Sequence, residues 1–247
     1  MTLTVGSLFS GIGGLDLGLE RAGMEVIWQS EIDPYACRVL KKHWPEVVNH
    51  GDIKAINWGN VVRPDVICGG YPCQPFSTAG KRGGQQDPRH LWPWVRTAIS
   101  ELRPQYAVLE NVRGHLSLGG LSVIGELATI GYDAEWRVIS AASVGAPHRR
   151  ERLFIVAYPH SKGLERCSGL QERSKEFSRF NIFGSSSQRH QERAQRSWWE
   201  SEPNVGRVAN GIPNRVDRLK GLGNAVVPQV AEVIGRLVVE HANIHAQ

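Results

Sequence analysis

The chain lacks the features that mark secreted, membrane-bound or disulfide-stapled proteins. Its 4 cysteines include no C-x-x-C pair. No apolar run approaches the length of a membrane-spanning helix, and the first residues have neither the basic nor the apolar region of a signal peptide. We therefore expect a cytoplasmic protein with reduced thiols and no membrane partner.

Charge of either sign is not in large excess. Lys and Arg number 29 against 24 Asp and Glu, and the pI is about 9.2. This balance permits a polyanionic partner without establishing one. A chain of 247 residues can bury a substantial core, either as one large domain or as a domain with a small appendage.

Residues 161–202 nearly lack aliphatic side chains, since Leu164, Leu170 and Ile182 are the only Leu, Ile or Val among them. Such a composition is too poor in apolar surface for a conventional independent core. Aromatic residues interleaved with arginines, Trp198 and Trp199 among them, suit stacking on bases and contact with phosphates. A charge-balanced linker fits the same composition.

The chain is organised around residues 69–77, which read Gly-Gly-Tyr-Pro-Cys-Gln-Pro-Phe-Ser. They follow a short apolar run, residues 65–68, that predicts a buried strand. This places Cys73 just past the carboxyl end of a strand, where open α/β sheets bind ligands. Pro72 and Pro75 stiffen the loop on either side. Cys73 is therefore a candidate nucleophile; the alternative is a small buried hydrophobic residue in a turn.

A glycine turn between a predicted strand (3–9) and a predicted helix (15–22) indicates a nucleoside site. Gly11, Gly13 and Gly14 let the backbone approach a ligand, and the helix start favours an anionic group. A second predicted strand (24–30) leads to Glu31, about where such folds place the acid that binds ribose hydroxyls. The third glycine of the dinucleotide fingerprint falls at Asp16, so the pattern fails and an adenosyl group without a pyrophosphate fits better.

Further along the chain, Asp52 could accept from an exocyclic amine, while Ile53 offers an apolar surface to a ring. Taken alone, Asp52 more often caps the following segment. The stretch 78–89 is rich in glycine and carries basic residues that could meet phosphates, although a solvated surface loop fits it too. These basic residues are Lys81, Arg82 and Arg89.

Glu110 follows the predicted strand 106–109, beside the expected place of Cys73 if the sheet is parallel. A catalytic acid is one interpretation, and a salt-bridged rim residue is the other. Arginines just before the predicted strand 153–157 need anionic partners such as Glu110, Glu151, a phosphate or a base edge. Alternation along a strand puts Arg150 and Arg152 on the same face and Arg149 on the other.

The chain resembles the DNA cytosine-5 methyltransferases in seven motifs that occur in that family's order. The resemblance covers about residues 3–158 and 218–237. It departs from the family at His148, where glutamine is usual, and in the short segment before the last motif. The motifs are Phe9-x-Gly11-x-Gly13, Glu31, Gly51-Asp52-Ile53, Pro72-Cys73-Gln74, Glu110-Asn111-Val112, His148-x-Arg150-x-Arg152 and Gly223-Asn224-Ala225-Val226.

The resemblance implies an α/β fold, a Rossmann-like sheet with helices on both faces that binds S-adenosyl-L-methionine and methylates carbon 5 of a flipped-out cytosine in duplex DNA. The implied catalytic residues are Cys73, Glu110, Arg150 and Arg152. The implied cofactor residues are Phe9, Gly11, Gly13, Gly14, Leu15, Glu31, Ile32, Asp52, Ile53, Asn224 and Val226. The expected DNA contacts are Gln74, Ser77, Lys81, Arg82, Arg89, His148, Trp198 and Trp199.

We expect residues 1–159 and 216–247 to form the catalytic domain, and residues 160–215 a small irregular target-recognition insertion. We also expect a monomer that needs no metal and is encoded in a bacterial, prophage or phage setting. RNA is the competing substrate, although the Cys-Phe-Thr element of the family's RNA branch is missing. A DNA-binding relative without catalysis is a further hypothesis, which the intact Cys73, Glu110 and Arg150 disfavour. A nicotinamide oxidoreductase is the last hypothesis, and Asp16 disfavours it.

Overall fold

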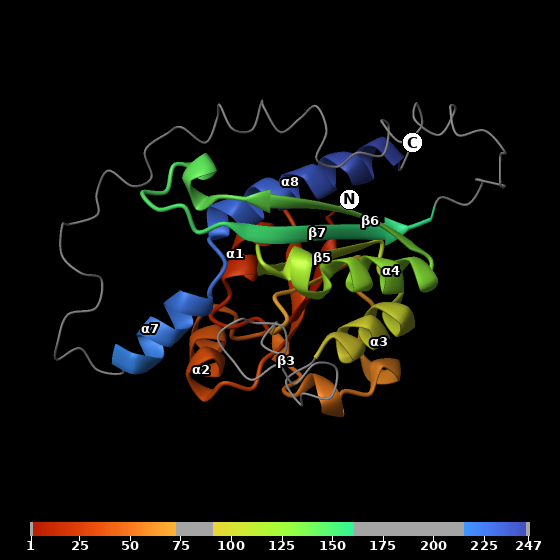
Figure 1. Cartoon of the computed structure of the whole chain (residues 1–247). Helices are drawn as coiled ribbons and strands as arrows, with labels where there is room; N and C mark the ends of the chain where they lie inside the picture. Colours follow the sequence, from red (N-terminus) through yellow and green to blue (C-terminus); the bar gives the residue numbers. More distant parts are fainter. Residues whose placement is uncertain (1, 73–90, 161–214, 246–247) are drawn as a thin grey trace, which may run out of the picture.

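The computed structural model describes residues 2–72, 91–160 and 215–245. These residues form a layered α/β structure in which helices cover both faces of a central sheet (Figure 1). The strands are β1 (Thr4–Leu8), β2 (Glu25–Ser30), β3 (Val48–Asn49), β4 (Val66–Gly69), β5 (Tyr106–Val112), β6 (Tyr132–Ile139) and β7 (Arg152–Pro159). The helices are α1 (Gly14–Arg21), α2 (Pro34–His43), α3 (Trp92–Leu102), α4 (Leu121–Thr129), α7 (Arg215–Asn224) and α8 (Pro228–His245). Short helical turns lie at η1 (Ile53–Ala55), η2 (Trp58–Asn60), η5 (Leu116–Gly120) and η6 (Ala141–Val144).

The sheet has the order β3-β2-β1-β4-β5-β7-β6. Strands β3, β2, β1, β4 and β5 pair in parallel, whereas β7 is antiparallel to both β5 and β6. The chain leaves β1 toward one side of the sheet and later enters β4 on the other side, so the strand order reverses between them. Open α/β sheets bind ligands at the carboxyl ends of the strands at such a reversal. The glycine turn, which we define as residues 9–14, and the segment that leads to Cys73 both start there.

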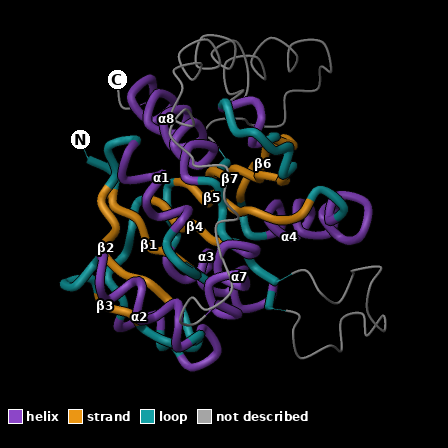
Figure 2. The backbone as a smooth tube through the Cα atoms, turned by 90° about the vertical axis from the view of Figure 1, so that its left-hand side faces the viewer, coloured by secondary structure: helices purple, strands orange, loops and turns teal. Residues whose placement is uncertain are grey.

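Two hydrophobic clusters fill the two faces of the sheet. Along β5 the buried side chains alternate: Tyr106 and Val108 join the cluster under α1 and α8, while Ala107 and Leu109 join the one under α3 and α4. This alternation follows from the two-residue period of a strand. Figure 2 shows α1 and α8 next to each other at one side of the strands, and α4 away from them on the other side. The predicted Rossmann-like architecture with helices on both faces is therefore confirmed.

Helix α8 packs closely on α1. A Cβ atom on Gly18 of α1 would lie 2.4 Å from the carbonyl oxygen of Pro228, the first residue of α8, so only glycine permits this approach. Val230, Ile234 and Leu237 form a stripe along α8 that is buried here. The stretch Lys220–His245 is long and apolar enough, by length and composition alone, to cross a membrane, and 33% of its apolar window is buried within the described structure.

Some element bounds differ from those expected from the sequence. Strand β5 continues past Glu110 to Val112 because it pairs with β7 in the register Glu110↔Phe154 and Val112↔Arg152. Strand β6 begins at Tyr132 because it pairs along the whole of β7. Strand β3 is short and comprises only Val48–Asn49. The glycine-rich stretch 78–89, and residues 161–214 of the recognition insertion expected at 160–215, lie outside the described residues.

Candidate functional site

A buried carboxyl group forms the centre of the site. Glu110 lies within β5, and its side chain is paired with Arg152, the first residue of the neighbouring strand β7, with 2.9 Å between Oε1 and Nε. Glu110 is 8% exposed. The antiparallel register that sets Val112 opposite Arg152 brings the two side chains to the same end of the sheet.

Burial raises the pKa of Glu110 from 4.5 to about 7, although the positive charges of Arg152 and Arg150 oppose the shift. Desolvation disfavours the charged carboxylate more strongly than the nearby arginines favour it. Near neutral pH the protonated and the ionised form of Glu110 are therefore both well populated. A carboxyl group in this state can donate a hydrogen bond as well as accept one.

The segment that leads to Cys73 begins beside Glu110. Parallel pairing of β4 with β5 sets Gly69 opposite Leu109, and a Cβ atom on Gly70 would lie 2.8 Å from Glu110 Oε2. Asn111 donates from Nδ2 to the carbonyl oxygen of Tyr71 at 3.1 Å and so fixes the start of this segment to β5.

The hydroxyl oxygen of Tyr71 lies 2.9 Å from Nε2 of His115, and this contact fixes the side chain of Tyr71. Asn111 and His115 are not among the site residues that the sequence predicts. Asn111 belongs to a recognised motif, but no local signal marks His115. Several predicted site residues lie outside the described part of the chain: Cys73, Gln74, Ser77, Lys81, Arg82, Arg89, Trp198 and Trp199.

Arg150 occupies a different place from the one expected by strand alternation. Its backbone has a φ of 31°, in the left-handed region, and it precedes β7, so the two-residue period does not apply to it. Its Nη2 donates to the carbonyl oxygens of Gly223 and Ala225, each at 2.6 Å. The expectation that Arg150 and Arg152 extend together from one strand face is therefore wrong. Arg152 pairs with Glu110, while Arg150 ties this segment to the turn between α7 and α8.

The two glycines of the turn have the backbone geometry that their composition predicts. Gly11 and Gly13 have φ values of 58° and 80°, which glycine adopts without the penalty that other residues incur. Phe9, with a φ of 52°, lies in the same left-handed region despite its side chain. The amide of Gly11 donates to Glu31 Oε2 at 2.8 Å. The turn after β1 and the acid after β2 are thus in direct contact, as their expected joint role requires.

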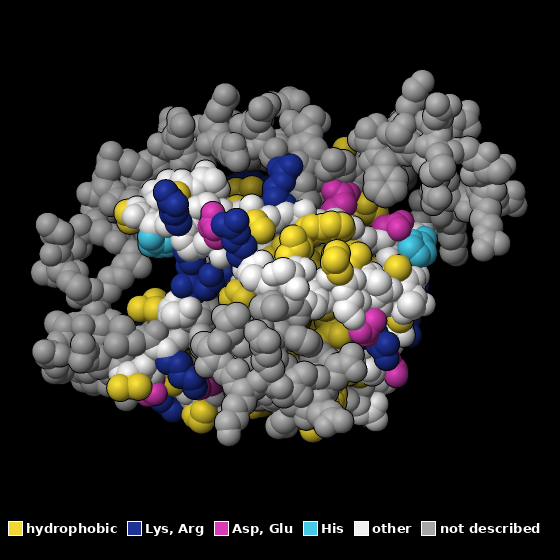
Figure 3. All heavy atoms as spheres, viewed as in Figure 1, with side chains coloured by type: hydrophobic (Ala, Val, Ile, Leu, Met, Phe, Trp, Pro, Cys, Tyr) yellow, Lys and Arg dark blue, Asp and Glu magenta, His cyan; other side chains and the backbone are white. Residues whose placement is uncertain are grey.

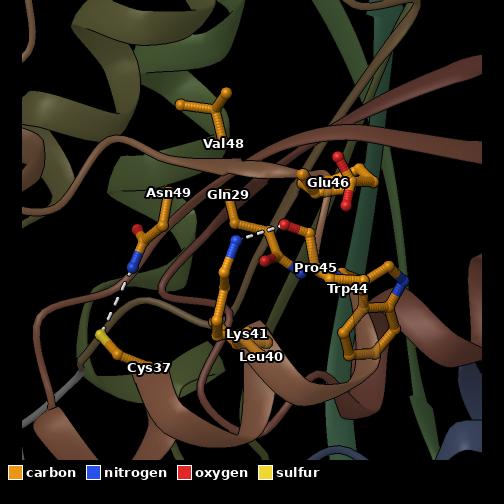
Figure 4. Close-up of a pocket in the computed structure, with 10 residues that line it drawn as sticks. Gln29, Cys37, Leu40, Lys41, Trp44, Pro45, Glu46, Val48 and Asn49 are labelled. Carbon is orange, nitrogen blue, oxygen red and sulfur yellow. Dashed lines mark hydrogen bonds between the residues drawn. The ribbon is translucent and has the colours of Figure 1, made fainter.

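Glu31 is held by several neighbours. Its Oε1 accepts from the amides of Ile32 and Asp33 at 2.8 and 2.7 Å. Its own amide donates to Asn49 Oδ1 at 3.0 Å, and its carbonyl oxygen accepts from Asn49 Nδ2 and from Cys37 Sγ. Figure 4 shows Asn49 directed at Cys37 along the wall of a cavity of about 390 Å³ between α2 and β3. These contacts fix the position of Glu31, and the sequence pattern singles out neither Asn49 nor Cys37.

The remaining predicted cofactor residues lie in varied environments. Asp52 accepts from the amide of Lys54 at 3.0 Å and caps η1, the local role that is common for such a residue. Ile53 and Leu15 are buried in opposite core clusters, so their side chains serve packing. Ile32 is 66% exposed at the end of β2.

A cavity of about 850 Å³ adjoins the glycine turn. Its walls include Gly13, Gly14 and Val226, three of the predicted cofactor residues, together with His148 and Arg150. Phe9, Glu31, Asp52 and Asn224 are not among the described residues that line it. Residues that the sequence pattern does not single out complete the wall, among them Leu17, Val39, His43 and Trp44, whose indole Nε1 donates to Glu20 Oε1 at 2.8 Å.

The surface near the start of β7 is basic. Figure 3 shows Lys and Arg side chains gathered around the connection between β6 and β7, with hydrophobic side chains beside them. Arg149 and His148 in this connection are exposed. No group of three or more side chains that could hold a metal ion occurs in the described ranges.

Comparison with known proteins supplies independent information. The family model described as C-5 cytosine-specific DNA methylase matches residues 3–210. The Type II methyltransferase M.Eco47II of Escherichia coli is 42% identical over 164 residues, covering 62% of this chain and 39% of that protein. M.NgoFVII of Neisseria gonorrhoeae is 36% identical over 166 residues, covering 64% of this chain and 44% of that protein. The chain therefore spans less than half the length of these curated relatives.

Solved structures agree with these sequence matches. An E. coli protein described as a DNA modification methyltransferase encoded within a prophage is 29% identical, with a TM-score of 0.53, and the match covers 64% of this chain and 47% of that one. The Dnmt2 methyltransferase of S. pombe has a TM-score of 0.66 over 98% of this chain and 99% of its own. Its identity of 17% supports the fold alone.

Proposed function

The chain belongs to the C-5 cytosine-specific DNA methylase family, and on that premise we propose that it transfers a methyl group from S-adenosyl-L-methionine to carbon 5 of a flipped-out cytosine in duplex DNA. The observation that carries this proposal is the buried carboxyl group of Glu110, held by Arg152 next to the segment that leads to Cys73. Supporting it are the family match and the curated relatives that are Type II methyltransferases.

Cys73 is the proposed nucleophile. Carbon 5 of cytosine is too weak a nucleophile to take a methyl group unaided, and attack of the Cys73 thiolate on carbon 6 gives carbon 5 enamine-like character. After methylation, loss of the proton from carbon 5 expels the thiolate and restores the aromatic ring. A free thiol is only roughly 3% thiolate at pH 7, and nearby arginines would raise that fraction.

Glu110 is the proposed acid that stabilises the attacked base. A protonated carboxyl can donate to nitrogen 3 and offset the negative charge that thiolate attack creates. With a pKa near 7, a large fraction of Glu110 is protonated at neutral pH, whereas an ordinary glutamate would be almost wholly ionised. Arg152 is the proposed positioning partner, because its contact with Oε1 leaves Oε2 available for the base.

The residues around the glycine turn fit the adenosyl cofactor. When bound, S-adenosyl-L-methionine would supply a methyl group made electrophilic by its sulfonium. Glu31 already accepts three backbone amides, and a carboxylate has about four acceptor positions, so capacity for a ribose hydroxyl remains. The cavity of about 850 Å³ beside Gly13, Gly14 and Val226 offers room next to the start of α1, which has no side-chain cap.

We assign DNA binding to two regions. The basic surface around the β6–β7 connection suits contact with DNA phosphates. Because the reacting carbon atoms of cytosine are inaccessible in a stacked base pair, the base must be flipped out at a cost of about a few kcal/mol. Residues 160–215 are the proposed recognition insertion between the two parts of the catalytic domain, residues 1–159 and 216–247.

Bisulfite sequencing of DNA from cells that express the chain tests the proposal, because it reports both activity and target. Expression of the wild-type chain should protect cytosines in a defined sequence context, and expression of Cys73→Ala at the same level should protect none. Protection that is equal in the two cultures would refute covalent catalysis by Cys73. Methylated cytosine in RNA with none in DNA would instead identify RNA as the substrate.

A further inference from the structure

A fully buried carboxyl group lies directly beneath the glycine turn, and nothing in the proposed mechanism uses it. Asp16, the third residue of α1, is 0% exposed. Its Oδ1 accepts from Ser7 Oγ on β1 at 2.6 Å, and its Oδ2 accepts from Gln29 Nε2 on β2 at 2.7 Å. Burial raises the pKa of Asp16 to about 6, so the group is mainly ionised at neutral pH.

None of the contacts that shift the pKa of Asp16 is with a positively charged group. Cys68 on β4 faces it, with a thiol pKa that burial raises well above the ordinary value, and Glu20 on α1 repels it weakly. Retaining a buried carboxylate in such surroundings is costly unless its hydrogen bonds are complete. Short bonds from Ser7 and Gln29, together with the amide of Asp16 itself, supply hydrogen bonds to the carboxylate, and the two side-chain bonds join three elements at one point.

Ser10 links this network to the glycine turn. Its hydroxyl donates to Ser7 Oγ at 2.9 Å, and also lies 3.3 Å from the carbonyl oxygen of Ser7. Its carbonyl oxygen accepts from the amide of Gly13 at 2.9 Å, and its amide donates to the carbonyl oxygen of Ser30 at 3.3 Å. Ser10 therefore connects the middle of the turn to β1, β2 and α1.

The direction of these hydrogen bonds is set by Asp16. An ionised carboxylate accepts hydrogen bonds and cannot donate one. Ser7 must therefore donate its only hydroxyl hydrogen to Asp16, which leaves the lone pairs of Ser7 to accept from Ser10. Removing the carboxylate frees Ser7 to rotate, and the bond that holds Ser10 then loses its fixed geometry.

We propose that Asp16 is a positioning residue that acts through Ser7 and Ser10 to hold the glycine turn in its cofactor-binding shape before the cofactor arrives. The inference rests on the proposed use of S-adenosyl-L-methionine. Preorganisation of a binding loop raises affinity by removing the cost of ordering it on binding. The effect of losing Asp16 should thus fall on the cofactor dissociation constant, not on the rate constant of the saturated enzyme.

Calorimetric titration of S-adenosyl-L-methionine into the full chain, without DNA, tests this proposal. Ser10→Ala removes one hydroxyl at the turn and leaves the bonds of Asp16 to Ser7 and Gln29 in place. We expect it to weaken binding about five- to tenfold, the effect of one lost hydrogen bond. Asp16→Ala should weaken binding at least as much. The double variant should be little weaker than Asp16→Ala alone, because both changes break one linkage.

Asp16→Asn is the conservative variant. Its amide can accept from Ser7 and donate to a rotated Gln29, so it should restore most of the affinity. The matched control is Thr4→Val at the opposite end of β1, where Thr4 Oγ1 donates to Asp65 Oδ2 at 2.7 Å. This control should lower the melting temperature and change the dissociation constant by less than about twofold.

Three results would overturn the inference in distinguishable ways. If the wild-type chain binds the cofactor and Ser10→Ala binds it with the same affinity, the network serves folding alone. Ser10→Ala decides the question even where Asp16→Ala fails to fold. Additive losses in the double variant would likewise refute action through one linkage. Absence of binding by the wild-type chain would remove the proposed function itself, and the inference with it.

Discussion

Replacing Glu110 by glutamine should make the protein more stable than wild type at alkaline pH, although Glu110 is proposed to take part in methyl transfer. The native pKa of Glu110 is about 7, against 4.5 for the ordinary group. Because the folded-state value is the higher one, the stability that this group contributes is fully present below about pH 4.5 and is lost as the pH rises through 7. At about 1.4 kcal/mol for each pH unit, the full loss is about 3 kcal/mol.

The assay is urea unfolding of wild type and Glu110→Gln between pH 5 and pH 8, followed by tryptophan fluorescence. Other titrating groups contribute equally to both proteins and cancel in the difference. We expect the free energy of unfolding of Glu110→Gln to exceed that of wild type by about 2–3 kcal/mol more at pH 8 than at pH 5.

The control for this comparison is Glu151→Gln. Glu151 pairs with Arg113 at 2.6 Å, and both side chains are well exposed. Exposed pairs contribute little to stability, so the difference between this variant and wild type should stay nearly constant over the same pH range. If the difference for Glu110→Gln is also independent of pH, or if the variant grows less stable than wild type toward pH 8, then Glu110 is an ordinary ionised partner of Arg152. It could not then donate to the base at neutral pH.

The remaining predictions concern the cofactor and the DNA. Glu31→Ala should weaken S-adenosyl-L-methionine binding at least about tenfold while leaving DNA binding nearly unchanged, because each lost charge-assisted hydrogen bond is worth about 1.5–3 kcal/mol before relaxation; unchanged affinity by calorimetry would remove Glu31 from the site. Trp198→Ala combined with Trp199→Ala should lower DNA affinity or sequence discrimination without changing cofactor affinity, as measured by filter binding and bisulfite sequencing. Methylation of the same sites at the wild-type rate would show that these aromatic residues only pack.

The parallel half of the fold could be predicted from the sequence because its signals are local. Short apolar runs mark buried parallel strands, and in such sheets a functional residue follows the strand directly. This reasoning locates Glu31 correctly at the end of β2, and the contact of Glu110 with the start of the cysteine segment follows from the parallel pairing of β4 with β5.

The parts that could not be predicted depend on contacts between distant segments. Arg150 departs from strand alternation because its carbonyl partners, Gly223 and Ala225, lie more than seventy residues away. In the sequence Asp16 is only a mismatch to a fingerprint, since its partners Ser7 and Gln29 come from two other elements. A pattern of spacing within one segment carries no information about such partners.

The central claim, covalent catalysis by Cys73, is tested most directly by trapping the reaction on duplex DNA that contains 5-fluorocytosine. Fluorine replaces the proton that must leave carbon 5, so the thiolate cannot be expelled after methyl transfer. The account predicts a protein–DNA adduct that survives denaturant, depends on S-adenosyl-L-methionine and maps to Cys73 by mass spectrometry of the digested complex. Methylation of ordinary duplex DNA by the same preparation, with no such adduct on the fluorinated duplex, would contradict it.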